Sequence, residues 1–407
     1  MHSMNNRLNR LILFILNIYV FLNLSQFLNT IGIIHVPGYI YIFIFFIVSL
    51  YIYYMETIKY QIPRLFLNWS LYYIFIATFS LLFISDFNDI TWKVYYMLLF
   101  NIFTMYVYYV LFLLDNNNFT FTLNLMPYIA MSSAFLTISS YIWPDIFIPL
   151  KIYILNNDHR AVGTYINSNV TGNALNFLLI ISINNVKKNY RIFFILLLGI
   201  AIVVTFSRSN ILMYLLIVAV FPFFKVVRFS ELIVVFGIFF FLLGLFILNV
   251  DLLRESLGIN ISTDQIQRLM FFTDNKGSAS ISDGSATHRI EVAKKALEYF
   301  MNNSVMGAGI GVTRIWSDSI STHNTYLSLL AEYGFFGLVV LLFLLFAVTK
   351  NLIFSIDKSK KQLGVLFVIY ILFTSLFTHN TLDSSIKLGM FALILAISTK
   401  EQRKIYD

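Results

Sequence analysis

The sequence has no cysteine, only six prolines in 407 residues, and few charged side chains, which make up 12% of the chain. Without cysteine, thiol catalysis, disulfide bonds and thiolate metal sites are excluded. Hydrophobic residues make up 59% of the chain and the mean hydropathy is +0.79, more apolar surface than a soluble fold of this size can hide. The composition therefore predicts a polytopic membrane protein.

Twelve apolar runs follow one another along the chain, and most approach the ~20 residues that cross ~30 Å of hydrocarbon. They predict an all-α membrane protein of about twelve transmembrane helices. Nine of these helices fall in residues 1–250 and three in 323–407, separated by a large extracytoplasmic loop over 251–322 and followed by a cytoplasmic tail. The runs lie at about 10–28, 38–56, 65–85, 93–114, 120–142, 169–184, 192–206, 209–224, 230–250, 325–349, 363–380 and 384–398.

Lysine and arginine predict the orientation of these helices. With the N-terminus inside, the cytoplasmic connections hold sixteen of them, whereas the short outer connections hold five: Lys93, Lys151, Arg160, Arg208 and Lys387. Because positive residues accumulate on the cytoplasmic side, both termini are predicted to lie there. The net charge of +8 reflects this topology, so we expect no nucleic acid as a partner.

Residues 192–224 contain two apolar runs that cannot form one membrane-spanning helix. Joined, they would span ~48 Å, too long for one crossing. We therefore expect a hairpin that turns at 207–209, with arms of ~24 Å each. Arms this short predict that Arg208 lies below the outer surface, where an arginine is costly and marks a functional candidate. The alternative is that Arg208 snorkels to the lipid headgroups.

The large loop holds seven basic and eight acidic residues, so it is not a basic patch. Part of it has the apolar spacing of an amphipathic helix, at Ile290, Ala293, Leu297 and Phe300. We expect this helix over the membrane mouth, with Arg289 in its first turn. It is predicted to end before the glycine-rich turn GAGIG (307–311), whose backbone N–H groups are candidates to face an anion.

His323 stands where the loop re-enters the membrane, in the stretch STHNTYLSLLAEYGFFG (321–337). Its imidazole can exchange protons at physiological pH, which makes it a candidate general base. Arg160, Arg208 and Arg289 are predicted on the same side, and arginine suits a diphosphate because its guanidinium makes bidentate contacts and stays charged. These residues predict a site that holds a lipid pyrophosphate and takes a proton from a sugar hydroxyl.

Each of these residues also has a purely structural interpretation. Arg160 and Arg289 suit ordinary loop salt bridges, and His323 suits a helix start bonded to backbone. Gly334 and Gly337 suit close helix packing. A second copy of THNT, at 378–381, places His379 at another outer helix end, and the sequence does not decide which histidine is the base.

Together, these segments resemble the O-antigen polymerase and O-antigen ligase superfamily. The ligase motif of His, then Asn, Ser or Gln, nine residues and GxxG is met by His323, Asn324, Gly334 and Gly337. The glycine-rich turn GAGIG is similar to one that often follows the loop helix in this family. The resemblance covers about 155–340.

Three arginines extend the resemblance. The hairpin arginine of the family resembles Arg208 in TFSRSN, and its loop arginine resembles Arg289 in SATHRIEVAKKAL. An arginine before a glycine-containing helix start resembles Arg160 in HRAVGTYINSN. The resemblance implies that His323 is the base and that these three arginines bind pyrophosphate. Further candidates for the site are Asn324, Arg314 and His379.

The family implies a glycosyltransferase of the bacterial inner membrane, with its active site on the periplasmic face. It transfers a glycan from undecaprenyl pyrophosphate to a sugar hydroxyl, without a metal, cofactor or nucleotide sugar. The implied partners are the lipid-linked oligosaccharide, the bilayer and a chain-length regulator protein. The layout of GAGIG and THNT favours a polymerase of O-antigen or capsule repeat units. The alternatives are an O-antigen ligase, which transfers to lipid A core, and a flippase or transporter for the lipid-linked oligosaccharide.

Overall fold

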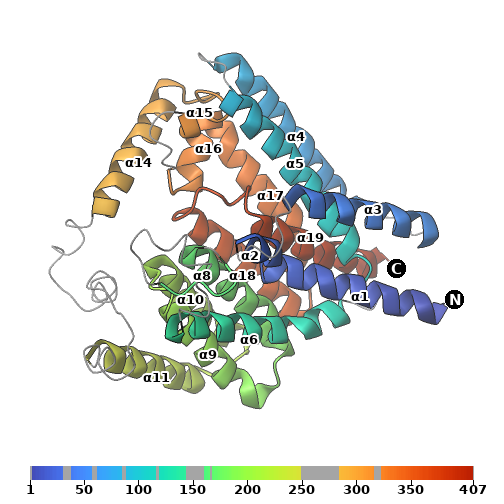
Figure 1. The fold of residues 1–407 in the computed structure, drawn as a ribbon, viewed down its shortest axis with the longest axis vertical. Helices are drawn as coiled ribbons and strands as arrows, with labels where there is room; N and C mark the ends of the chain where they lie inside the picture. The colour runs from blue at the N-terminus through green and yellow to red at the C-terminus, as the bar shows by residue number, and fades with distance from the viewer. Residues whose placement is uncertain are drawn as a thin grey trace. The chain divides into compact units, whose positions relative to one another are not determined.

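The computed structural model describes residues 2–30, 38–56, 62–84, 89–115, 119–143, 160–165, 167–248, 284–315 and 322–406. Every regular element in these ranges is a helix, as the sequence predicts (Figure 1). The chain divides into two compact units, which are described separately. Unit 1 comprises residues 1–44, 114–279 and 357–370, and unit 2 comprises 45–113, 280–356 and 371–407.

Unit 1 is a helical bundle in which α6 packs against α1, α8 and α9. Its helices are α1 (His2–Phe21), α2 (Leu24–Thr30), α6 (Thr120–Ile142), α8 (Ser168–Ser182), α9 (Arg191–Val203), α10 (Arg208–Val220) and α11 (Phe229–Leu248). Short 3₁₀ turns η3 (Ile183–Asn185), η4 (Lys188–Tyr190) and η5 (Phe221–Phe224) connect several of them. Buried tyrosines hydrogen-bond to backbone carbonyls on other helices, such as Tyr214 to Ile195 at 3.0 Å. Such bonds satisfy a polar group where water is absent.

Unit 2 is built around α4, α5, α17 and α19, with α14, α15 and α16 at one end (Figure 1). These helices are α4 (Arg64–Ser80), extended by η1 (Leu81–Phe83), α5 (Asp89–Phe112), α14 (Gly284–Asn302), α15 (Val312–Ile315), α16 (Thr325–Tyr333), α17 (Phe335–Ile353) and α19 (Ser385–Tyr406). The indole of buried Trp69 on α4 donates to the Val340 carbonyl of α17 at 2.8 Å. Two helices, α3 (Gly38–Glu56) and α18 (Lys358–Ser375), have residues in both units.

In the described residues, four helices are long and apolar enough to span a membrane: 64–83, 89–112, 120–142 and 335–353. Shorter apolar helices account for other predicted runs, among them 208–224 and 229–245. A membrane-embedded all-α protein is therefore supported, whereas the expected number of about twelve spans and the domain boundaries stay predictions. Most of the predicted large loop, including 251–283 and 316–321, lies outside the described residues.

The predicted division into two helices is confirmed, with the turn at 204–207 and not at the expected 207–209. Helices α9 and α10 are separate, pack against each other, and are joined by residues 204–207. Each has 13 residues, which makes it about 20 Å long. Arg208 is the first residue of α10, directly after the turn.

One predicted span is divided. The run at 325–349 forms two helices, α16 and α17, that meet at Gly334. Its φ of +61° ends α16, and a Cβ there would lie 2.3 Å from the Val305 carbonyl oxygen. Glycine is therefore required both by the backbone conformation and by the close approach of residue 305. The nine residues of α16 rise only about 14 Å, too little to cross a bilayer.

Candidate functional site

Helix α16 begins at the first THNT motif, and its start fixes the position of His323. Asn324 has extended backbone angles and its side chain accepts a hydrogen bond from the Leu327 N–H at 3.1 Å, so it is the N-cap. His323 directly precedes this cap with a φ of +50°, and its side chain is half-buried. The structure thus gives Asn324 a capping role and leaves the imidazole of His323 at the helix start.

The glycines of the ligase-like motif serve backbone packing, as the structural interpretation predicts. Gly334 forms the bend between α16 and α17, and Gly337 lies against the carbonyl of Leu329, where a Cβ would come within 2.2 Å. These contacts set the angle at which α17 leaves α16. Within the motif, only His323 is therefore a candidate for catalysis. Asn324 caps the helix, and Gly334 and Gly337 allow close backbone packing.

Three N–H groups of the glycine-rich turn donate to groups of unit 2 itself. The N–H groups of Ala308 and Gly309 donate to the carbonyls of Ala331 and Glu332 at 2.8 and 3.1 Å. The Ile310 N–H donates to the Ser80 hydroxyl at 3.2 Å. The turn supplies donors to the last carbonyls of α16, which have no partner within the helix. It holds the end of α16 opposite His323.

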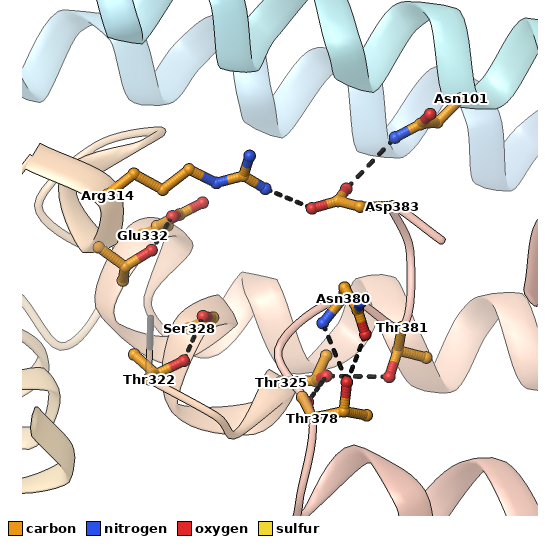
Figure 2. A network of polar contacts seen from close by, with 11 residues as sticks. Asn101, Arg314, Thr322, Thr325, Ser328, Glu332, Thr378, Asn380, Thr381 and Asp383 are labelled. Carbon is orange, nitrogen blue, oxygen red and sulfur yellow. Dashed lines mark hydrogen bonds and ion pairs between the residues drawn. The ribbon is translucent and has the colours of Figure 1, made fainter. Parts of the chain in front are cut away.

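The second THNT motif lies beside the first in unit 2 (Figure 2). The Thr325 hydroxyl donates to the Thr378 carbonyl and lies 2.9 Å from the Thr381 hydroxyl. The rings of His323 and His379 are in edge-to-face contact, with centroids 5.7 Å apart and planes at 83°. The sequence left open which histidine is the base, and the structure brings both into one site.

His379 is held in its neutral form. Burial lowers the pKa of His379 to about 4, assisted by the positive charges of neighbouring groups, His323, Arg314 and Lys387. The loop that contains it, between α18 and α19, is fixed by the Thr378 hydroxyl, which donates to the Asn380 side chain. At physiological pH this imidazole is therefore uncharged, so one ring nitrogen can donate a hydrogen bond and the other can accept one.

The site also contains an ion pair. The Arg314 guanidinium, on the short helix α15, pairs with the Asp383 carboxylate, which also accepts from the Asn101 side chain at 3.3 Å (Figure 2). The two side chains of the pair are 35% and 26% exposed, so they are only partly screened by solvent. Next to them, the buried Glu332 accepts from the Thr313 hydroxyl.

A cavity of about 50 Å³ opens beside these groups. Its polar lining includes Arg314, Glu332, His379 and Asp383, with Tyr73 and Thr313 beside them. A water needs about 10–15 Å³ of such space, so the cavity has room for a few waters next to His379. The neutral imidazole of His379 in this lining can accept a proton.

Arg289 lies in unit 2 on α14, where its side chain is exposed. The predicted amphipathic helix is confirmed, but it begins at Gly284, so Arg289 is in the second turn rather than the first. Within unit 2 the helix buries Val292 and Ala296, whereas Ile290 and Leu297 of the predicted apolar stripe are 56% and 47% exposed. The reason is packing: α14 lies against α16 on the face that contains residues 292 and 296.

Arg160 and Arg208 come together in unit 1. Arg160 donates to the Thr205 carbonyl at 2.8 Å, in the turn that precedes Arg208, and to the Asn169 side chain at 3.0 Å. Asn210 donates to the Asn169 carbonyl at 3.0 Å and so connects the starts of α8 and α10. Both arginines are half-buried. Because they belong to unit 1 and the histidines to unit 2, convergence of all four on one substrate stays a prediction.

Three residues of the site were not selected from the sequence. Asp383 follows the second THNT, but nothing local indicates its pairing with Arg314, 69 residues earlier. Glu332 was detectable as an acid within an apolar run. Lys387, which the sequence assigns to an outer connection, is buried in α19, and its ammonium donates to the Thr381 hydroxyl at 3.2 Å.

In the part of the chain that the structure describes, no group of three or more His, Asp or Glu residues is arranged to hold a metal ion. Comparison with known proteins gives one family. A family model described as O-antigen ligase matches residues 193–342, a segment that includes Arg208, Arg289, Arg314 and His323. No curated protein matches the chain.

Proposed function

We propose that the protein is a membrane glycosyltransferase, on the premise that residues 193–342 match a family model described as O-antigen ligase. It transfers a glycan from undecaprenyl pyrophosphate to a hydroxyl of a second lipid-linked repeat unit. The reaction takes place on the periplasmic face of the inner membrane and extends an O-antigen or capsule chain. The observation that supports this most directly is the half-buried His323, at a helix start within the matched segment and in contact with a neutral histidine.

In this reaction, the imidazole of His323 takes the proton of the acceptor hydroxyl. The freed oxygen forms a bond to the anomeric carbon of the donor sugar, and the bond from that carbon to the phosphate oxygen breaks. The electron pair leaves with undecaprenyl pyrophosphate. Arg208, Arg289 and Arg160 are the groups proposed to stabilise its charge, since bidentate guanidinium contacts suit phosphate oxygens.

His323→Ala tests the base. We expect at least a ~100-fold loss of polymer formation, typical of removing a general base, with unchanged protein in the membrane and intact lipid-linked precursor. Unchanged polymer would exclude His323 as the base. Accumulation of precursor on the cytoplasmic leaflet alone would indicate a flippase instead.

Arg289→Ala tests the pyrophosphate contact, with Lys294→Ala as a matched control that removes a positive charge from an exposed position of the same helix. Loss of polymer in the first variant and not in the second supports a specific role for Arg289. An equal loss of polymer in both variants would mean that Arg289 acts only through its contribution to the positive charge of α14.

An O-antigen ligase is the second candidate, because the matching family model has that description. The product that accumulates in the His323→Ala variant separates the two. A polymerase defect leaves single repeat units on lipid A core, whereas a ligase defect leaves long polymer on undecaprenyl pyrophosphate.

A further inference from the structure

Two connections of unit 1 meet at the base of the α9–α10 hairpin. One runs from η3 through η4 to the start of α9, and the other runs from η5 to the start of α11. The guanidinium of Arg191 joins them, because it donates to the Val186 carbonyl at 3.2 Å and to the Val226 carbonyl at 2.8 Å. Both connections therefore lie at the end of α9 that is opposite the turn before Arg208.

This end of the hairpin carries a concentrated positive charge. Residues 183–193 and 221–233 contain five basic side chains and one acidic side chain, which gives a net charge of +4. The acid is Glu231, whose carboxylate accepts from the Arg228 N–H at 2.7 Å. Four of the basic side chains are exposed: Lys187, Lys188, Lys225 and Arg228.

Exposed aromatic rings lie among these charges. Tyr190, Phe193, Phe223 and Phe229 are all between 59% and 74% exposed. The rings of Phe223 and Phe229 are in edge-to-face contact, with centroids 5.8 Å apart. Large apolar side chains next to lysine and arginine are typical of a surface at the boundary between phospholipid headgroups and acyl chains.

We propose that the hairpin-base surface, formed by these four basic residues and four aromatic rings, binds the headgroup of an anionic phospholipid. The basic side chains donate to the phosphate oxygens, and the rings contact the first carbons of the acyl chains. The length of the hairpin favours a lipid over a soluble phosphate. An arm of about 20 Å is shorter than the ~30 Å hydrocarbon core, so its base stays within reach of the headgroups.

Topology alone explains positive residues in these connections but not their arrangement. The positive-inside rule requires only that lysine and arginine lie in cytoplasmic loops. It requires neither a guanidinium that joins two loops nor exposed rings among their charges. The connection before α18 offers a comparison, because Lys358 and Lys361 are exposed there beside the acidic Asp357.

Native mass spectrometry of the full-length protein tests the proposal. In detergent with equal amounts of phosphatidylglycerol and zwitterionic phosphatidylethanolamine, the parent should retain phosphatidylglycerol preferentially. Lys225→Gln combined with Arg228→Gln should weaken this retention at least about fivefold, the factor expected for one basic residue near an anionic lipid surface. Lys358→Gln combined with Lys361→Gln removes the same charge from another connection and should retain the lipid as the parent does.

Unchanged retention in Lys225→Gln with Arg228→Gln would overturn the proposal. So would an equal loss in the control, because any lysine would then attract the lipid. Phe223→Ser with Phe229→Ser keeps every charge and should also lower retention. Full retention in that variant, or displacement of the lipid by excess inorganic phosphate, would identify a soluble phosphate as the ligand and contradict the lipid contact.

The parent protein alone provides a second measurement if these variants do not accumulate. Its preference for phosphatidylglycerol should weaken as ionic strength rises, because salt screens exposed charges. A preference that does not change with salt would exclude binding through the basic residues. Lipid retention is measured without substrate, so its result is separate from that of the proposed transferase activity.

Discussion

Glycine at three positions around α16 has no substitute among the other residues. Gly307 has a φ of +73°, and a Cβ there would lie 2.4 Å from the backbone of Glu332 and Tyr333. Gly334 and Gly337 make equally close approaches to the backbones of residues 305 and 329. These contacts place the glycine-rich turn against the end of α16, so the position of His323 depends on residues that have no chemistry of their own.

Gly307→Ala should therefore destabilise unit 2 strongly. Left-handed backbone costs an alanine roughly 1–2 kcal/mol, and the overlap with α16 adds to this. We expect a clearly lower melting temperature in detergent. Gly237→Ala is the matched control, because Gly237 lies within α11 with nothing within 4 Å of the added Cβ. Equal melting temperatures of the two variants would show that the close contact at Gly307 does not contribute to stability.

At the scale of the helix, the short element α15 is linked to the start of α19. Arg314 and Asp383 form this link, and Asn101 on α5 supports the carboxylate. The large loop thereby reaches the segment that contains His379. Removing one partner leaves the other charge beside the buried Glu332, which makes the pair more than a surface salt bridge.

A double-mutant cycle measures this link. Arg314→Ala and Asp383→Asn should each lower stability, and the double variant should cost less than the sum of the two. The expected coupling is about 0.5–1 kcal/mol, in the range of partly exposed pairs, and it should weaken with added salt. Additive single effects, measured by thermal unfolding, would contradict the prediction.

Helix-scale features differ in how far the sequence predicts them. The α9–α10 hairpin and α14 were predictable because run length and apolar spacing are local properties. The division at Gly334 was not, because its backbone conformation depends on packing against residue 305. The histidine pair required a contact between motifs 56 residues apart, which local patterns do not indicate. The residues of α14 that pack against α16 were not predictable for the same reason, because they are selected by a neighbouring helix.

For the molecule as a whole, the chain has no cysteine, so a single introduced cysteine can show on which side of the membrane a residue lies. Glu298, exposed on α14, is predicted outside, and Ile356, 99% exposed after α17, is predicted in the cytoplasm. In spheroplasts, a membrane-impermeant maleimide should label Glu298→Cys and not Ile356→Cys, and both should react after permeabilisation. Labelling of Ile356→Cys in intact spheroplasts would invert the predicted topology.

The glycine-rich turn also orders events during biosynthesis. It caps α16 with residues that the ribosome has already delivered, so this helix can be completed as it emerges. The second THNT, whose Thr381 meets Thr325, follows 56 residues later, after α17 and α18. His379 follows the last residue of α16, Tyr333, by 46 residues, so at about 5–20 residues per second a complete α16 precedes the second histidine by about 2–9 seconds. The complete pair, and with it the proposed chemistry, arises only near the end of translation.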